Sequence, residues 1–184
     1  MHDKLELLLR QIGINSMYYN YFENGKLDKI AVSKQYETAE FLITLDKILP
    51  ISIYDQFCEL LIRKFNTYDV KENFTVKNVS YEELSNYVNY FAQIFFEENV
   101  NEMIEELNIQ YKENVIKFNC SNEDIVDNFK LELEENLERA GFNNVKIIKG
   151  VINKEEHPII KNIQEIKEER IKNINKLLVK GKEV

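Results

Sequence analysis

Histidine and cysteine are the side chains best suited to nucleophilic, acid–base or metal chemistry near neutral pH, and this sequence holds two of each. His2 and His157 each lie at the edge of a predicted element, without a second evident metal ligand at helical or loop spacing. Cys58 and Cys120 are equally isolated, and Glu59 beside Cys58 has the wrong charge to stabilise a thiolate. The sequence therefore predicts no catalytic residue, no metal ligand and no cofactor, with both cysteines as reduced thiols in protein cores.

Adjacent carboxylates could do acid–base or two-metal chemistry, so the acidic pairs of this chain need an explanation. They all fall on segments with helical hydrophobic spacing, away from the apolar positions, which favours a solvated helix face. A small enzyme of unrelated type would need a pocket with converging polar groups, and no pattern here predicts one. The pairs are Glu97-Glu98, Glu105-Glu106, Glu134-Glu135 and Glu168-Glu169.

The charge of the chain is negative and unevenly distributed. The net charge is −8 over 184 residues. Residues 71–153 carry 8 basic and 16 acidic side chains, whereas residues 154–184 carry 8 basic and 6 acidic ones. Because a nucleic-acid-binding protein normally presents a basic face, this balance favours a protein partner and makes nucleic-acid binding possible but weak. No signal peptide and no apolar run of about 20 residues is present, so we expect a cytoplasmic protein without a membrane partner.

Residues 1–70 show the pattern of a first module with element order α-β-β-β-α. A helix over 3–12 ends at Gly13, and the Asn24-Gly25 pair is a strong hairpin signal. With 44% hydrophobic residues, the chain has enough apolar material for a core here and in a second module. The remaining expected elements are strands over 17–23, 27–34 and 39–46 and, after Pro50, a helix over 52–65.

Residues 71–153 predict a second α+β module, and residues 154–184 a charged helical connector, either packed or partly exposed. Ser80 and Glu83 have the spacing of a capping box at the start of a long helix, and Gly141 is placed to end a later helix that Ser121 begins. The fold class is therefore α+β, with two small tandem units, each a β-hairpin or antiparallel sheet packed with helices, plus the C-terminal helix. The expected elements are a strand over 74–79, helices over 81–107 and 122–140, a hairpin turning at Glu113-Asn114, and a strand near 143–152.

The aromatic run "MYYNYF" at 17–22 exceeds what one buried strand face needs. In a strand, Tyr19 and Tyr21 would face one way and Tyr18 and Phe22 the other. If one face is buried, the other leaves aromatic rings exposed, as at protein interfaces. Tyr18, Tyr19, Tyr21 and Phe22 are therefore the candidate partner-binding residues, unless neighbouring elements cover both faces.

The order helix, hairpin, helix, strand is also similar to that of KH-like nucleic-acid modules. A KH module grips the nucleic-acid backbone with a GXXG loop, and the sequence contains no such tetrad. The element order nevertheless leaves an alternative function: a KH-like module that assists template or single-strand binding.

Several segments together resemble the N-terminal region of PolC-type DNA polymerase III alpha subunits from low-GC Gram-positive bacteria. They are "LLLRQIGIN", "YYNYFENGKLDKIAVSK" and "FLITLDKILPISIYDQFCELLIRKF", followed more loosely by "NVIKFNCSNEDIVDNF" and "EEHPIIKNIQEIKEERIKNI".

The resemblance implies a fragment without catalytic residues, taken from a larger DNA-directed DNA polymerase with 3'-5' exonuclease activity. It implies docking to the tau subunit of the clamp loader in DNA replication, with the rest of the polymerase chain downstream.

Overall fold

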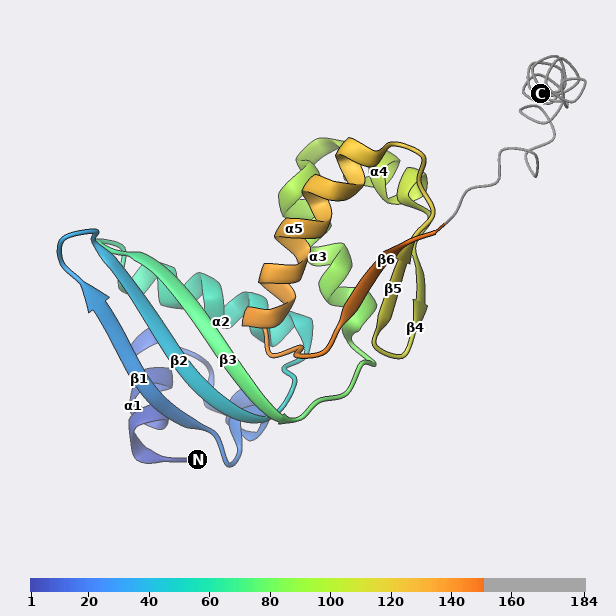
Figure 1. Cartoon of the computed structure of the whole chain (residues 1–184). Helices are drawn as coiled ribbons and strands as arrows, with labels where there is room; N and C mark the ends of the chain where they lie inside the picture. The colour runs from blue at the N-terminus through green and yellow to red at the C-terminus, as the bar shows by residue number, and fades with distance from the viewer. Residues whose placement is uncertain (151–184) are drawn as a thin grey trace, which may run out of the picture. The chain divides into compact units, whose positions relative to one another are not determined.

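The computed structural model describes residues 1–150, and residues 1–149 form one compact unit (Figure 1). The connector expected at 154–184 and His157 lie outside the described residues. The elements in chain order are α1 (Asp3–Ile12), the 3₁₀ helix η1 (Ser16–Phe22), β1 (Lys26–Ser33), β2 (Thr38–Lys47), α2 (Ile51–Lys64), β3 (Asp69–Asn78), α3 (Leu84–Phe96), the 3₁₀ helix η2 (Glu97–Asn99), α4 (Val100–Leu107), β4 (Gln110–Lys112), β5 (Val115–Phe118), α5 (Glu123–Arg139) and β6 (Lys146–Lys149).

The α+β fold class is confirmed, and the two sheets share one topology. The first sheet has the order β1-β2-β3 and the second the order β4-β5-β6. In each sheet a hairpin supplies an antiparallel pair, and the third strand then pairs in parallel with the second strand of that hairpin. Because a parallel pair needs a crossover connection, α2 and α5 take equivalent positions. Each sheet therefore contains one antiparallel and one parallel strand pair, instead of antiparallel pairs alone. The similarity to a KH-like fold stays a prediction.

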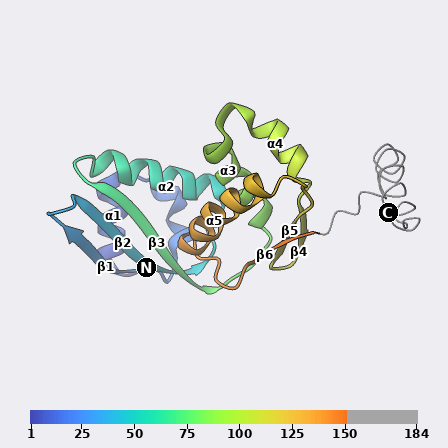
Figure 2. The ribbon, with the colours of Figure 1, turned by 45° about the horizontal axis from the view of Figure 1, so that its top comes forward.

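Alternation along β2 determines which face of the first sheet is buried. Phe41, Ile43 and Leu45 are buried on one face, and α1 and α2 cover that face (Figures 1 and 2). The ring of Phe57 on α2 lies 5.4 Å from that of Phe74 on β3. This packing positions α2 against the buried face of the first sheet.

The segment 17–23 was predicted as a strand, and this prediction is wrong because the segment forms η1. The side chain of Asn15 accepts a hydrogen bond from the Met17 amide at 3.0 Å, and the Asn15 carbonyl accepts one from the Tyr18 amide at 3.0 Å. Such a cap offers the backbone local partners in place of a strand neighbour. The hairpin consequently forms one strand later, between β1 and β2, with Glu37 at φ 53° in its turn.

The strand expected at 74–79 begins earlier, at Asp69, and belongs to the first sheet beside β2. Val70, Phe74 and Val76 add their side chains to the buried face. The first sheet therefore continues past residue 70, where the sequence analysis placed a boundary between modules.

The single helix expected at 81–107 is interrupted. Glu97 has φ 52°, outside the helical region, and separates α3 from η2 and α4. The capping box is also wrong, because α3 begins only at Leu84. Asn122 rather than Ser121 caps α5, whereas the glycine stops after α1 and α5 are confirmed.

Candidate partner-binding surface

The 3₁₀ helix η1 is held between two fixed points. On its N-terminal side, Ile14 is buried and Asn15 caps the helix. On its C-terminal side, Phe22 is fully buried, with its ring 5.9 Å from that of Phe57. Gly25 then leaves no room for a side chain, since a Cβ there would lie 2.8 Å from the Phe22 carbonyl oxygen. The position of η1 is therefore determined by the core beneath it.

The structure separates the candidate residues Tyr18, Tyr19, Tyr21 and Phe22 into three environments. Phe22 is a core residue, whereas Tyr18 and Tyr19 are half-buried against the core. Tyr21 is 41% exposed, and its ring lies 6.5 Å from that of Tyr18. Since side chains three residues apart align on a 3₁₀ helix, Tyr18 pairs with Tyr21 rather than with Phe22.

Met17 is a further exposed apolar residue of η1, and the sequence analysis did not select it. Its side chain is 67% exposed. The prediction of a strand selected only the aromatic residues of this six-residue run, although Met17 belongs to it as well. Exposed methionine beside tyrosine is a composition enriched at protein interfaces.

Tyr21 also lines a groove of about 370 Å³ between η1 and the segment that leaves β2. We call this the η1 groove. Glu23 and Asp46 contribute carboxylates to its wall, and Lys47 one ammonium group. Its lining is completed by Asn20, Asn24, Ile48 and Pro50. The exposed part of η1 thus adjoins a concave surface of mixed polarity.

The two cysteines considered for nucleophilic chemistry lie in environments that suit packing and not catalysis. Burial, together with the nearby Glu72 carboxylate, raises the pKa of the Cys58 thiol well above its usual range. Burial also raises the pKa of the Cys120 thiol, whose Sγ lies 3.6 Å from a Glu106 carboxylate oxygen. A thiol needs a lowered pKa to act as a nucleophile, so both cysteines are placed for packing.

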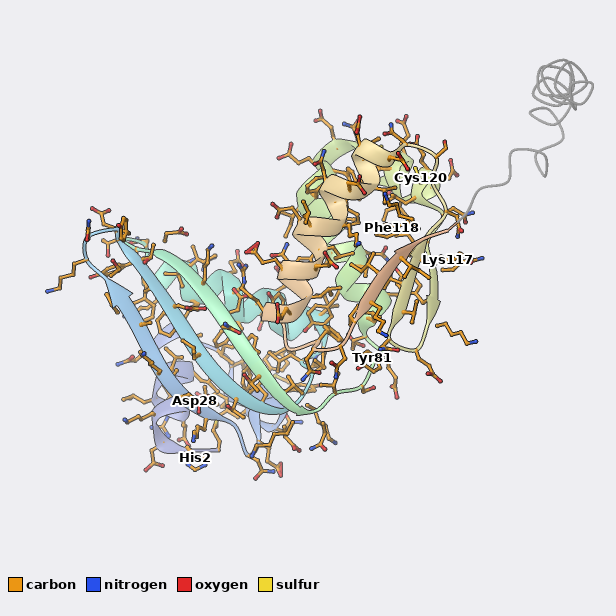
Figure 3. The ribbon with its side chains drawn as sticks, in the orientation of Figure 1. His2, Asp28, Tyr81, Lys117, Phe118 and Cys120 are labelled. Atoms are coloured by element: carbon orange, nitrogen blue, oxygen red, sulfur yellow. The ribbon has the colours of Figure 1, made fainter. Side chains whose placement is uncertain are left out.

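The buried carboxylate of Glu72 has a partner of its own: the Tyr54 hydroxyl donates a hydrogen bond to it at 2.5 Å. His2 is exposed at the start of α1, where its carbonyl accepts bonds from the Leu5 and Glu6 amides. Figure 3 shows His2 beside the first sheet and Cys120 near the start of α5, too far apart to share a site.

Within residues 1–150, no group of three or more histidine, cysteine, aspartate or glutamate side chains is arranged to hold a metal ion. In the same part of the chain, no helix is both long and apolar enough to cross a membrane.

Fold and surface together define an α+β protein of repeated topology that presents an apolar, partly aromatic 3₁₀ helix. Residues 4–76 match the family model described as DNA polymerase III polC-type N-terminus I. The resemblance stated from the sequence is thereby confirmed over these residues, which comprise nearly all of the first sheet and its helices. No curated protein and no solved structure matches the chain.

Proposed function

We propose that this chain is a non-catalytic docking region of a replicative PolC-type DNA polymerase, and that its partner is the tau subunit of the clamp loader. The observation that carries the proposal is the pair of exposed side chains, Met17 and Tyr21, on η1. Large apolar side chains on a defined surface provide most of the binding energy in protein interfaces. Polymerase and exonuclease chemistry would then belong to parts of the polymerase other than this region.

The packing of η1 against the core supports a docking role. Phe22 and Gly25 fix the helix against the core, so Met17 and Tyr21 are presented in one orientation. A surface that is already ordered loses little conformational entropy on binding. The adjoining η1 groove can accept a side chain of the partner beside Tyr21.

The experiment is titration calorimetry of the complete chain with the C-terminal part of tau from the same organism. The double variant Met17→Ala/Tyr21→Ala should weaken binding at least about 10-fold, since interface anchors typically contribute more than 1 kcal/mol each. Tyr36→Ala is the matched control, because Tyr36 is a 72% exposed tyrosine in the β1–β2 turn. It should leave the affinity unchanged.

Two results would overturn the proposal. One is the absence of binding between the unmodified chain and tau. The other is equal affinity for the unmodified chain and the double variant, with both shown to be folded by thermal melting. Loss of binding with Tyr36→Ala alone would move the contact to the β1–β2 turn.

A further inference from the structure

The second sheet has one buried face and one open face. Ile116 and Phe118 on β5 and Ile147 on β6 are buried, and the Phe118 ring stacks on Phe129 of α5 at 5.8 Å. The residues that alternate with them must point to the opposite side. Figure 3 shows this at Lys117, which lies on the side of β5 away from α5, whereas its neighbour Phe118 lies toward that helix.

The strand register arranges the open face in two rows. Lys112 pairs with Val115, and Val115 pairs with Lys146. The next row is formed by Gln110, Lys117 and Ile148. With strands about 4.8 Å apart and a rise of about 3.3 Å per residue, the three lysine Cα atoms lie within about 10 Å of one another. We call this surface the lysine face.

The lysine face is accessible and slightly concave. Ile148 is 46% exposed, and Lys112 and Lys146 are exposed as well. A hollow of about 620 Å³ is lined by Gln110, Tyr111, Lys112, Val115, Lys117 and Ile148. The face therefore combines ammonium groups with the apolar side chains of Val115 and Ile148.

Its charge contrasts with that of the helices that accompany the second sheet. Among residues 1–150, none of the three lysines forms an ion pair, whereas Lys149 at the end of β6 pairs with Asp127 at 2.8 Å. Of the 16 acidic side chains in residues 71–153, 12 lie on η2, α4 and α5. Glu113, in the β4–β5 turn, is the acidic residue of this hairpin. Charge is thus separated in this part of the chain, with acidic helices and a basic sheet face.

The open face of the first sheet provides a comparison. It also carries three exposed lysines, Lys29, Lys71 and Lys77. There, however, Asp28, Glu40 and Asp46 lie on the same strands, and their carboxylates accept hydrogen bonds from Thr44, Asn73 and Asn78. Positive charge is therefore balanced on the first sheet and unbalanced on the second.

We propose that the lysine face binds the sugar–phosphate backbone of single-stranded DNA. Lysine ammonium groups act as point charges for phosphates. Val115 and Ile148 offer apolar contact to sugars and to unstacked bases. A single strand exposes its bases to such contact, whereas a duplex keeps them stacked inside. Tyr111 lines the hollow, but it stands between the two rows and pairs with Ile116 of the buried face, so no aromatic ring belongs to either row. The contact is therefore electrostatic and independent of base sequence.

Charge also argues against the other occupants of this face. Residues 154–184 carry 8 basic and 6 acidic side chains, so they do not complement a positive surface. A second copy could place its acidic helices on the lysine face, in a closed or an open assembly, and sedimentation in the experiment below tests for this self-association. Binding of an acidic peptide is the alternative that the experiment separates.

The experiment measures fluorescence anisotropy of a labelled oligothymidylate of about 20 nucleotides, with the complete chain, across a range of salt concentrations. Lys112→Gln/Lys117→Gln/Lys146→Gln should weaken binding at low salt at least about 10-fold. It should also reduce the slope of log K against log salt by about 2, at about 0.7 per phosphate contact on a single strand. Lys29→Gln/Lys71→Gln/Lys77→Gln removes the same charge from the first sheet and should change neither quantity.

The proposal is overturned if the unmodified chain does not bind the oligonucleotide at low salt. It is also overturned if the two triple variants behave alike, or if oligoglutamate displaces the oligonucleotide at equal charge concentration. A change of sedimentation between the unmodified chain and the Lys112, Lys117 and Lys146 variant would point instead to self-association. Because Met17 and Tyr21 are untouched in both variants, tau binding should persist, so this result and the docking result can fail separately.

Discussion

The carboxylate of Glu83, immediately before α3, accepts a hydrogen bond from the backbone N–H of Ile51, the first residue of α2, at 3.1 Å. Pro50 is the N-cap residue of α2, and its side chain makes no hydrogen bond that could cap the helix. One turn further along α3, the Tyr87 hydroxyl donates to the Leu49 carbonyl at 2.7 Å. The start of α3 thus supplies the polar partners of the β2–α2 connection, and a negative charge lies where the dipole of α2 favours it.

Removing this cap should destabilise the protein. Glu83→Ala leaves the Ile51 amide without its partner, and loss of a helix cap typically costs about 1 kcal/mol of unfolding free energy. The measurement is urea unfolding followed by circular dichroism. Glu82→Ala is the control, since Glu82 is exposed and adjacent, and it should change stability by less than about 0.5 kcal/mol. Equal stability of the two variants would show that the Glu83–Ile51 bond contributes nothing.

The same bond shows where local sequence patterns stop being informative. Ser80 and Glu83 have capping-box spacing, but the partner of Glu83 lies 32 residues earlier in the chain. The pairing of β3 with β2 is equally long-range, because a crossover helix separates them. Neither relationship leaves a periodic trace in the sequence.

Elements with a strong hydrophobic period were predicted within a few residues. The helix expected over 3–12 is α1, which ends before Gly13 at φ 88°, and the strand expected over 39–46 is β2, Thr38–Lys47. By contrast, Tyr and Phe in η1 favour strands by propensity, and the Asn15 cap outweighed that preference. The aromatic residues of the sequence thus pointed to the candidate surface. Its 3₁₀ geometry and the contribution of Met17 became evident only in the structure.

Gly141 and Gly13 allow backbone strain and steric space to be separated. Both have left-handed φ values, 106° and 88°. A Cβ at Gly13 would meet nothing within 4 Å, whereas at Gly141 it would lie 2.4 Å from Val76 Cγ2. Gly13→Ala should therefore cost about 1–2 kcal/mol, the strain of a left-handed alanine.

Gly141→Ala should cost that strain and about 1–3 kcal/mol more, because the added methyl group overpacks the contact between the end of α5 and β3. Chemical denaturation of both variants gives the comparison. Adding Val76→Ala to Gly141→Ala should recover part of the difference. If the two alanine variants are equally stable, the close approach at Val76 does not constrain the fold.

The stability of the fold should fall at alkaline pH because of its buried tyrosines. Burial raises the pKa of the Tyr54 and Tyr87 hydroxyls far above their usual range, with the Glu72 carboxylate adding to the shift. Partial burial raises the pKa of Tyr111, which is 38% exposed, to about 12. Because the folded state holds these protons more tightly than the unfolded chain, their contribution is complete below about pH 10, the pKa of an unfolded tyrosine.

As pH rises above about 10, the unfolded chain ionises its tyrosines first, and the unfolding free energy decreases. For Tyr111 this decrease should end near its folded pKa of about 12. Thermal melting between pH 8 and pH 12 would measure it, and Tyr111→Phe should make the decrease shallower by removing one such proton. Ultraviolet titration of the ten tyrosines provides the contrary outcome: if all of them ionise near pH 10 while the chain is still folded, the buried hydroxyls do not control alkaline stability.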